Sequence, residues 1–324
     1  MTMTSSSSVR DAASATAVVL LCPGQGAQHV GMGQAWAEAS AAAREVFEAA
    51  DRLLGFSLSG LCFGGPEEEL ARTDKAQPAI YTASVASYRA LVAAGEFAEG
   101  DVAMTAGLSL GEFTALHLAG AVSFEDGLRL VRLRGEAMQA AAEAADSGMV
   151  AITGDVDEAK ILELCDQARG DGVLVPANYN SSMQVVISGS RDACERAVPV
   201  AESMGFKATV LVVAGAFHSP LMAPAAERLR AALEETSWSA PRTPVLSNVT
   251  GEVHDSDPAM IRERLVEQLT SPVRWSQSMT LAADRYGSHR FVELSPGRVL
   301  SGLMKRIDRS IKVQNHATPP TSPA

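Results

Sequence analysis

A serine lies at the centre of the pattern Gly-x-Ser-x-Gly, in the segment Gly107-Leu108-Ser109-Leu110-Gly111. This pattern is typical of a nucleophile elbow, a sharp turn from a strand into a helix that exposes the serine hydroxyl. Free N–H groups at the helix N-terminus can then receive an oxyanion. Because glycine and serine are common residues, the pattern alone is equally compatible with a turn that does no chemistry. If it is an elbow, the chemistry is acyl transfer through Ser109.

A serine hydroxyl is a poor nucleophile at neutral pH and needs a base within hydrogen-bond reach. Of the six histidines, His218 has the most suitable context, because the segment 215–220 follows a predicted strand and precedes a predicted helix. Catalytic groups gather at such places in parallel α/β sheets. The others fit surface, loop, helix-face or tail positions: His29, His117, His254, His289 and His316. His218 is therefore the candidate base.

Three further polar residues could contribute to such a site. Gln25 and Gln268 could offer polar contacts, and the backbone N–H groups of 23–28 and of Leu110 could supply two oxyanion donors. Arg134 falls on a predicted helix with hydrophobic neighbours. It is either a surface salt-bridge partner or a bidentate clamp for a carboxylate, a task that suits arginine better than lysine. We find no spacing typical of a metal site or a phosphate-binding loop.

Alternating strands and helices must position these residues. Apolar, β-branched runs predict strands, and 3.6-residue periodicity predicts helices. This order implies an α/β fold with a parallel sheet. The expected strands are 17–22, 102–106, 245–248 and 290–294, and the expected helices are 34–54, 76–94, 110–119, 124–145, 223–233, 258–269 and 299–306.

The segment 148–213 has a different texture, with the order strand-helix-strand-strand-helix-strand. That order is typical of the ferredoxin-like arrangement, and we expect it to form a small domain inserted into the large one. The expected strands are 149–153, 173–177, 184–188 and 207–213, with a turn at 178–181, and the helices are 157–168 and 192–204, the latter kinked at Pro199.

Composition narrows the functional class. The chain has 324 residues, 47% of them hydrophobic, and a net charge of −11, so it is globular and an unlikely partner of nucleic acid. No apolar run approaches the length of a membrane span. Its four cysteines show no paired spacing, which favours reduced thiols in a cytoplasmic protein. We expect residues 1–16 and 318–324 to be disordered.

Six sequence blocks together identify a family. They span residues 17–310 in a single order: Pro23–Gln28, Gly107–Glu112, Arg132–Gly135 with Met138-Gln139, Gly215–Met222, Gln268 with Pro272–Trp275, and Glu293–Gly297. In these blocks the chain resembles malonyl-CoA:acyl carrier protein transacylases and the acyltransferase domains of polyketide synthases. The resemblance implies an α/β-hydrolase-like large domain over 17–147 and 214–310, the ferredoxin-like insertion over 148–213, and a tail over 311–324.

The resemblance also implies residue roles. Ser109 is the expected acylated nucleophile and His218 its base, oriented by the backbone carbonyl of Gln268. The backbone N–H groups of Gln25 and Leu110 would form the oxyanion hole. The expected substrate-binding residues are Arg134, which would anchor the malonyl carboxylate, Gln268, and Phe217, whose ring would crowd an α-methyl group. Leu108 departs from the family, which usually has histidine there.

The reaction implied is a ping-pong transfer of malonyl from malonyl-CoA to the phosphopantetheine thiol of acyl carrier protein, with no cofactor or metal, in fatty acid biosynthesis. A stand-alone acyltransferase serving a polyketide synthase, and a serine thioesterase or hydrolase, are the alternatives. Arg134 argues against a hydrolase, which does not need a cation in its acyl pocket. We expect a monomer that does not bind a membrane. It would dock the acidic carrier protein through basic residues near its end: Arg298, Lys305, Arg306 and Arg309.

Overall fold

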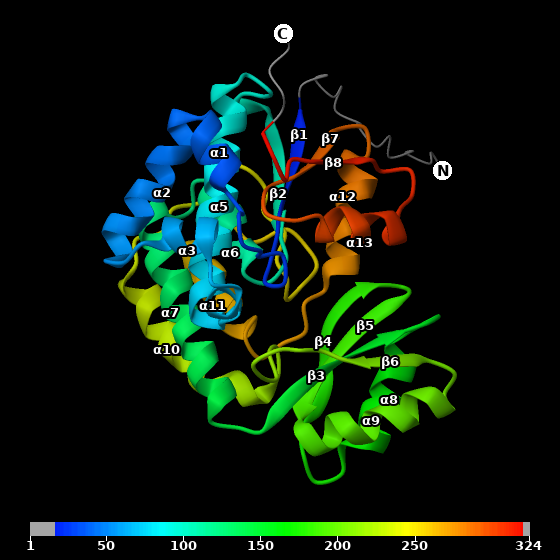
Figure 1. Ribbon diagram of the computed structural model, residues 1–324. Helices are drawn as coiled ribbons and strands as arrows, with labels where there is room; N and C mark the ends of the chain where they lie inside the picture. Colours follow the sequence, from blue (N-terminus) through cyan, green and yellow to red (C-terminus); the bar gives the residue numbers. More distant parts are fainter. Residues whose placement is uncertain (1–16, 320–324) are drawn as a thin grey trace, which may run out of the picture.

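The computed structural model describes residues 17–319, which form two β-sheets with helices packed on them (Figure 1). The first sheet is parallel, with the order β2-β1-β7-β8. Its strands are β1 (Val18–Cys22), β2 (Val102–Gly107), β7 (Arg290–Glu293) and β8 (Val313–Asn315). Every residue of β1 is buried, as expected for a central parallel strand that is covered on both faces.

Side chains alternate along β1 between two hydrophobic cores. Val18, Leu20 and Cys22 face the larger core, whereas Val19 and Leu21 face the smaller one. Helices α12 (Trp275–Tyr286) and α13 (Val299–Ile307) cover the smaller core. The helices of the larger core lie on the opposite side of the sheet (Figure 1): α1 (Gln34–Ala39), α2 (Ala41–Leu54), α3 (Leu58–Gly64), α4 (Glu67–Ala71), α5 (Thr73–Ala93), α6 (Gly111–Leu118), α7 (Phe124–Glu143), α10 (Ala223–Glu235) and α11 (Pro258–Glu267).

The second sheet is antiparallel, with the order β4-β5-β3-β6, and forms a separate lobe with its helices (Figure 1). One face packs on its helices in a core of its own, which includes Val150 and Ile187. The other face contributes Met149 and Val186 to the larger core. The elements are β3 (Ser147–Thr153), α8 (Glu158–Arg169), β4 (Leu174–Ser181), β5 (Gln184–Ser190), α9 (Arg191–Ser203) and β6 (Lys207–Val210).

The mixed α/β class predicted from the sequence is confirmed, but several boundaries differ. The predicted helix 34–54 is two helices, because Ser40 is extended and its hydroxyl accepts a hydrogen bond from the N–H of Ala43. The predicted turn at 178–181 is wrong, since these residues continue β4 and the hairpin turns at 182–183. Instead of a strand at 245–248, single bridges join Val245 to Thr105 and Leu246 to Val253.

Some elements were not predicted. Helix α12 was missed, and β8 lies inside the segment expected to be a tail, where it pairs with β7. Two short 3₁₀ turns, η1 (Glu99–Asp101) and η2 (Pro220–Met222), also went unpredicted. The disorder predicted for 1–16 and for 318–324 lies outside the described part of the chain, except at residues 318–319. Within residues 17–319, no helix has the length and apolar character needed to cross a membrane.

The turn from β2 into α6 requires glycine on both sides of Ser109. A Cβ on Gly107 would lie 1.9 Å from the carbonyl carbon of Gly111, and one on Gly111 would lie 2.1 Å from the carbonyl oxygen of Cys22. These contacts are far too short, so a larger residue at 107 would force the turn open and one at 111 would push the elbow away from β1. Ser109 itself has φ = 53°, a conformation that non-glycine residues rarely adopt.

We expect Gly111→Ala to lower the free energy of unfolding by at least about 2 kcal/mol, because the added methyl group meets backbone that cannot move without shifting β1. Gly302→Ala is the matched control, since Gly302 lies inside α13 with open space around its Cα. Alanine there should stabilise by about 0.5–1 kcal/mol. Urea unfolding of both variants measures the difference, and equal effects would contradict the steric account.

Candidate active site

Ser109 and His218 are in hydrogen-bond contact although 109 residues separate them in the sequence. The Ser109 Oγ lies 2.8 Å from His218 Nε2, and His218 Nδ1 lies 2.8 Å from the backbone carbonyl oxygen of Gln268. A carbonyl oxygen can only accept, so Nδ1 carries the proton and Nε2 is free to accept the serine proton. This geometry is that of a nucleophile and its general base, with a carbonyl in the orienting position.

Both residues have strained backbones. His218 has φ = 56°, close to the value at Ser109, and they are the only non-glycine residues with positive φ among residues 17–319. Such conformations persist only where the surroundings hold them. Asn248 does so at the elbow: its Oδ1 accepts from the Ser109 N–H at 2.6 Å, and its Nδ2 donates to the Gly107 carbonyl at 2.7 Å. One side chain therefore clamps both sides of the turn.

The two backbone N–H groups predicted as oxyanion donors are available. Neither the Gln25 N–H nor the Leu110 N–H has a hydrogen-bond partner within residues 17–319. Gln25 lies in the loop after β1, and Leu110 directly precedes α6. The loops pack closely, since a Cβ on Gly24 would lie 2.3 Å from the carbonyl oxygen of Leu108. Free donors on two adjoining loops suit stabilisation of an oxyanion.

Arg134 is buried, 1% exposed, which excludes the surface salt bridge left open by the sequence. Its Nη2 donates to Ser109 Oγ at 3.0 Å and to Gln268 Oε1 at 2.9 Å, and its Nη1 donates to Gln77 Oε1 at 2.8 Å. Its buried Nε has no partner among the described residues. Burial lowers the pKa of Arg134 to about 10, partly offset by Glu112, so the side chain stays charged at neutral pH.

Burial and the nearby Arg134 cation lower the pKa of His218 to about 4. Both effects act against the imidazolium, the first by removing water and the second by charge repulsion. His218 is therefore neutral at physiological pH, the form that can accept a proton from Ser109.

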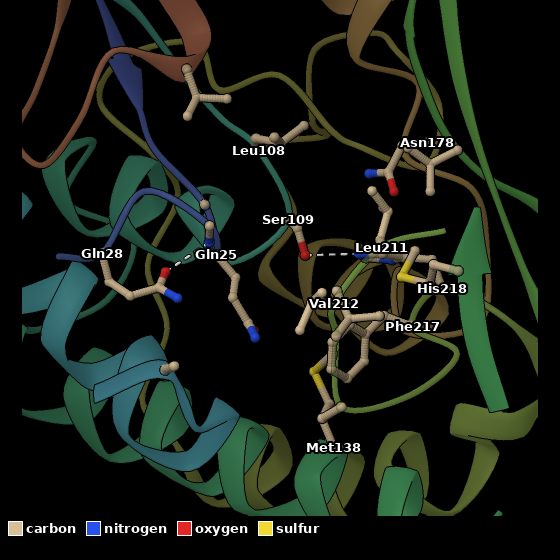
Figure 2. A pocket seen from close by; sticks show the side chains of 18 of the residues that line it. Gln25, Gln28, Leu108, Ser109, Met138, Asn178, Leu211, Val212, Phe217 and His218 are labelled. Atoms are coloured by element: carbon tan, nitrogen blue, oxygen red, sulfur yellow. Dashed lines mark hydrogen bonds between the residues drawn. The ribbon is translucent and has the colours of Figure 1, made fainter. Parts of the chain in front are cut away.

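Ser109 opens into a cavity of about 540 Å³ between the two lobes. Figure 2 shows its hydroxyl pointing toward His218, with Phe217, Met138 and Val212 among the apolar side chains around the cavity. Asn178, Asn180 and Gln184 line it from the antiparallel sheet. Asn178 and Asn180 were missed because 178–181 was predicted as a turn instead of a strand, whereas Gln184 was predicted in a strand but given no role. Residues of α13, Val299 and Leu303, also line the cavity.

The structure brings all the predicted site residues together, and Arg134 and Gln268 form the inner wall behind Ser109 instead of lining the cavity. It also adds residues to which the sequence analysis gave no role. His254, predicted to lie in a loop, is buried, with its Nε2 2.6 Å from Glu112 Oε1. The one signal of this contact in the sequence was a glutamate directly after the elbow pattern.

Comparison with known proteins identifies the family. Residues 19–318 match the acyl transferase domain family. The chain therefore belongs to this family and is an acyltransferase. Curated relatives named malonyl CoA-acyl carrier protein transacylase include those of Bacillus subtilis (strain 168), 41% identical over 94% of both chains, and Escherichia coli (strain K12), 42% identical over 90% of this chain and 93% of that one.

Solved structures agree with this assignment. The malonyl-CoA:acyl carrier protein transacylase from Xanthomonas oryzae pv. oryzae is 44% identical, covers 94% of this chain and 95% of its own, and has a TM-score of 0.88. A second, described as a type II PKS acyl-carrier protein in complex with its malonyl-transacylase, is 36% identical, covers 94% and 96%, and has the same TM-score of 0.88.

The reactivity of Ser109 should not depend on pH near neutrality. Because the pKa of His218 is lowered to about 4, the base stays neutral from pH 8 down to pH 5.5. Modification of Ser109 by phenylmethanesulfonyl fluoride, followed by intact mass, should keep a constant rate over that range. An unperturbed histidine would instead slow the reaction about tenfold by pH 5.5, and such a fall would contradict the assignment. Arg134→Ala should raise the pKa of His218, so that the rate of Ser109 modification begins to fall at a higher pH.

Proposed function

We propose that this chain transfers the malonyl group of malonyl-CoA to the phosphopantetheine thiol of acyl carrier protein, as a step of fatty acid biosynthesis. The observation that carries the proposal is the buried Arg134 guanidinium in contact with the hydroxyl of Ser109. A cation at that point can bind a carboxylate on the acyl group attached to the serine. The names of the relatives support the same donor and acceptor.

In the first half-reaction, Ser109 Oγ attacks the thioester carbonyl while His218 Nε2 takes the hydroxyl proton. The oxyanion receives hydrogen bonds from the Gln25 and Leu110 N–H groups. When the tetrahedral intermediate collapses, the carbon–sulfur bond breaks and His218 returns the proton to the departing thiolate. Coenzyme A leaves, and the malonyl group remains as an ester on Ser109.

The second half-reaction reverses these steps with a different thiol. His218 takes the proton of the phosphopantetheine thiol, and the sulfur attacks the ester carbonyl. The same N–H groups hold the oxyanion. The carbon–oxygen bond to Ser109 then breaks, and the proton on His218 restores the serine hydroxyl. Transfer instead of hydrolysis requires that the thiol reach the ester before water does.

Arg134 distinguishes this function from a simple serine hydrolase. Its Nη groups are held by Gln77 and Gln268, while its buried Nε has no partner in the described chain. The Nη2 atom also donates to Ser109 Oγ, so a carboxylate on an acyl group attached to Ser109 would meet this donor. An esterase for uncharged acyl groups gains nothing from such a cation.

Phe217 is the proposed selector against branched acyl groups. It is 7% exposed, lines the cavity and directly precedes the catalytic base. Its ring would occupy the space of an α-methyl group. Since a single methyl group is worth about 1–3 kcal/mol, selection for malonyl over methylmalonyl would be marked but incomplete.

The proposed carrier-protein face lies on and beside α13. Arg298, Lys305, Arg306 and Arg309 are exposed there, and the same helix contributes Val299 and Leu303 to the cavity. This places positive charge beside the entrance that an acidic carrier protein must reach.

A polyketide carrier protein is the alternative acceptor, because one structural relative was solved with a type II PKS acyl-carrier protein. Comparison of the malonyl transfer rates to a fatty acid carrier protein and to a polyketide carrier protein decides between the two pathways.

We also propose the finer description of the fold. The order β3-α8-β4-β5-α9-β6 and the sheet order β4-β5-β3-β6 support a ferredoxin-like domain over 148–213. The parallel sheet with helices on both faces and a strand-serine-helix elbow supports an α/β-hydrolase-like domain over 17–147 and 214–310, to which β8 adds an edge strand.

Ser109→Ala should abolish the malonyl-enzyme adduct, because no other hydroxyl is in contact with His218 among the described residues. Intact mass after incubation with malonyl-CoA reports the adduct, and peptide mapping locates it. The matched control is Ser59→Ala, because the Ser59 hydroxyl donates to Asp51 and neither residue lines the cavity. Its loss should leave the adduct unchanged. An adduct on another residue would contradict the assignment of Ser109 as the nucleophile.

Arg134→Ala should lower kcat/KM for malonyl transfer about 100-fold, since a charged hydrogen bond to the carboxylate is lost. Acetyl transfer, which has no carboxylate to bind, should be unchanged or faster. Arg132→Ala is the control on the same helix, because its partly exposed ion pair with Glu136 contributes little. Single-turnover rates with malonyl-CoA and acetyl-CoA test the difference, and equal losses on both donors would make Arg134 a structural residue.

A further inference from the structure

A second buried polar cluster lies behind the site, and no step of the reaction uses it directly. It consists of Glu112 on α6 and His254 in the loop after Val253, each with a side chain only 1% exposed. The Glu112 carboxylate receives three hydrogen bonds: from His254 Nε2 at 2.6 Å, from the Asn248 N–H at 3.1 Å, and from Gln268 Nε2 at 2.5 Å. Burying a carboxylate is costly unless it is fully hydrogen-bonded, which suggests a role that justifies its position.

Gln268 connects this cluster to both reactive parts of the site. Its backbone carbonyl accepts from His218 Nδ1, and its side-chain Oε1 accepts from Arg134 Nη2. Its Nε2 donates to Glu112 and to the Ser109 carbonyl oxygen at 3.0 Å. A single residue therefore holds the base through its main chain and the cation through its amide.

The orientation of that amide depends on Glu112. An amide can turn over and exchange its oxygen and nitrogen, which would point an NH₂ group at the Arg134 guanidinium. A carboxylate and a carbonyl oxygen only accept hydrogen bonds, so Glu112, together with the Ser109 carbonyl, selects the orientation in which Nε2 faces them and Oε1 faces Arg134. His254, donating to the other carboxylate oxygen, holds Glu112 in place.

We propose that Glu112, held by His254, is a positioning residue that orients the Gln268 amide and, through it, the Arg134 guanidinium that receives the acyl carboxylate. Neither side chain touches the substrate. The inference rests on the proposed function, because it assigns Arg134 to the malonyl carboxylate. Its specific consequence is that Glu112 contributes to selection between a charged and an uncharged acyl group.

Glu112→Gln is the sharpest test. Each oxygen of Glu112 faces a donor, so an amide in that place must point its NH₂ at one of them and disturb either Gln268 or His254. We expect kcat/KM for malonyl transfer to fall about 10- to 100-fold, with a much smaller loss for acetyl transfer. In the Arg134→Ala background, Glu112→Gln should leave the malonyl-to-acetyl ratio unchanged, because the group it orients is gone.

Two further variants keep the test decisive if Glu112→Gln does not fold. His254→Leu removes one donor to Glu112 and should lower the malonyl-to-acetyl ratio, as Glu112→Gln does. His254→Gln keeps a donor near the position of Nε2 and should retain the wild-type ratio. Glu293→Gln is the matched control, a buried carboxylate bonded to Leu300, Ser301 and Asn315. It should lower thermal stability without changing the ratio.

We would measure single-turnover acylation rates with malonyl-CoA and acetyl-CoA, together with the thermal unfolding of every variant. A lowered malonyl-to-acetyl ratio in Glu112→Gln that vanishes without Arg134 supports the inference. An unchanged ratio, or equal losses on both donors, overturns it. If the wild-type chain forms no malonyl ester on Ser109, the proposed function fails. If the wild-type chain forms the ester and Glu112→Gln behaves like the wild type, only the role of Glu112 fails.

Discussion

The burial of the Arg134 cation against the Ser109 hydroxyl is the constraint on which the site depends. A guanidinium removed from water must find acceptors, and the chain supplies them from two other helical regions, Gln77 on α5 and Gln268 at the end of α11. The Gln268 amide lies between Arg134 and the Glu112 carboxylate and forms a hydrogen bond to each. The same cation helps to keep His218 neutral. Charge, base and nucleophile are therefore one coupled arrangement.

The parallel sheet gives that arrangement its geometry. The carboxyl ends of β1 and β2 meet at one edge, where the loop with Gln25 and the elbow with Ser109 pack against each other. Neighbouring parallel strands hold this edge rigid because they are buried on both faces. The antiparallel lobe then closes one side of the cavity, tied to the parallel lobe where Tyr179 and Ala177 exchange backbone hydrogen bonds with Val273.

The sequence predicted best what is local and carries a distinctive pattern. The elbow pattern around Ser109 and the strand-to-helix context of His218 were sufficient to predict these residues as the candidate nucleophile and base. It left Arg134 undecided, because helical periodicity does not tell whether an arginine faces solvent or a buried pair of glutamines. It missed His254 and Asn248 for a related reason: their partners at the elbow are 142 and 139 residues away. A polar residue in an irregular segment shows its burial only once such long-range contacts form.

The coupling between Arg134 and His218 also links substrate choice to reactivity. Burial, together with the uncompensated Arg134 charge, lowers the pKa of His218 to about 4, which makes it a weak base for a serine hydroxyl and a poor carrier of the proton needed by the leaving thiolate. In the proposed complex, the acyl carboxylate neutralises much of the Arg134 charge, so the repulsion on the imidazolium falls and the pKa of His218 rises. The base is then strengthened when the correct acyl group is bound. An acetyl group offers no such compensation, and its transfer has to proceed with the weaker base.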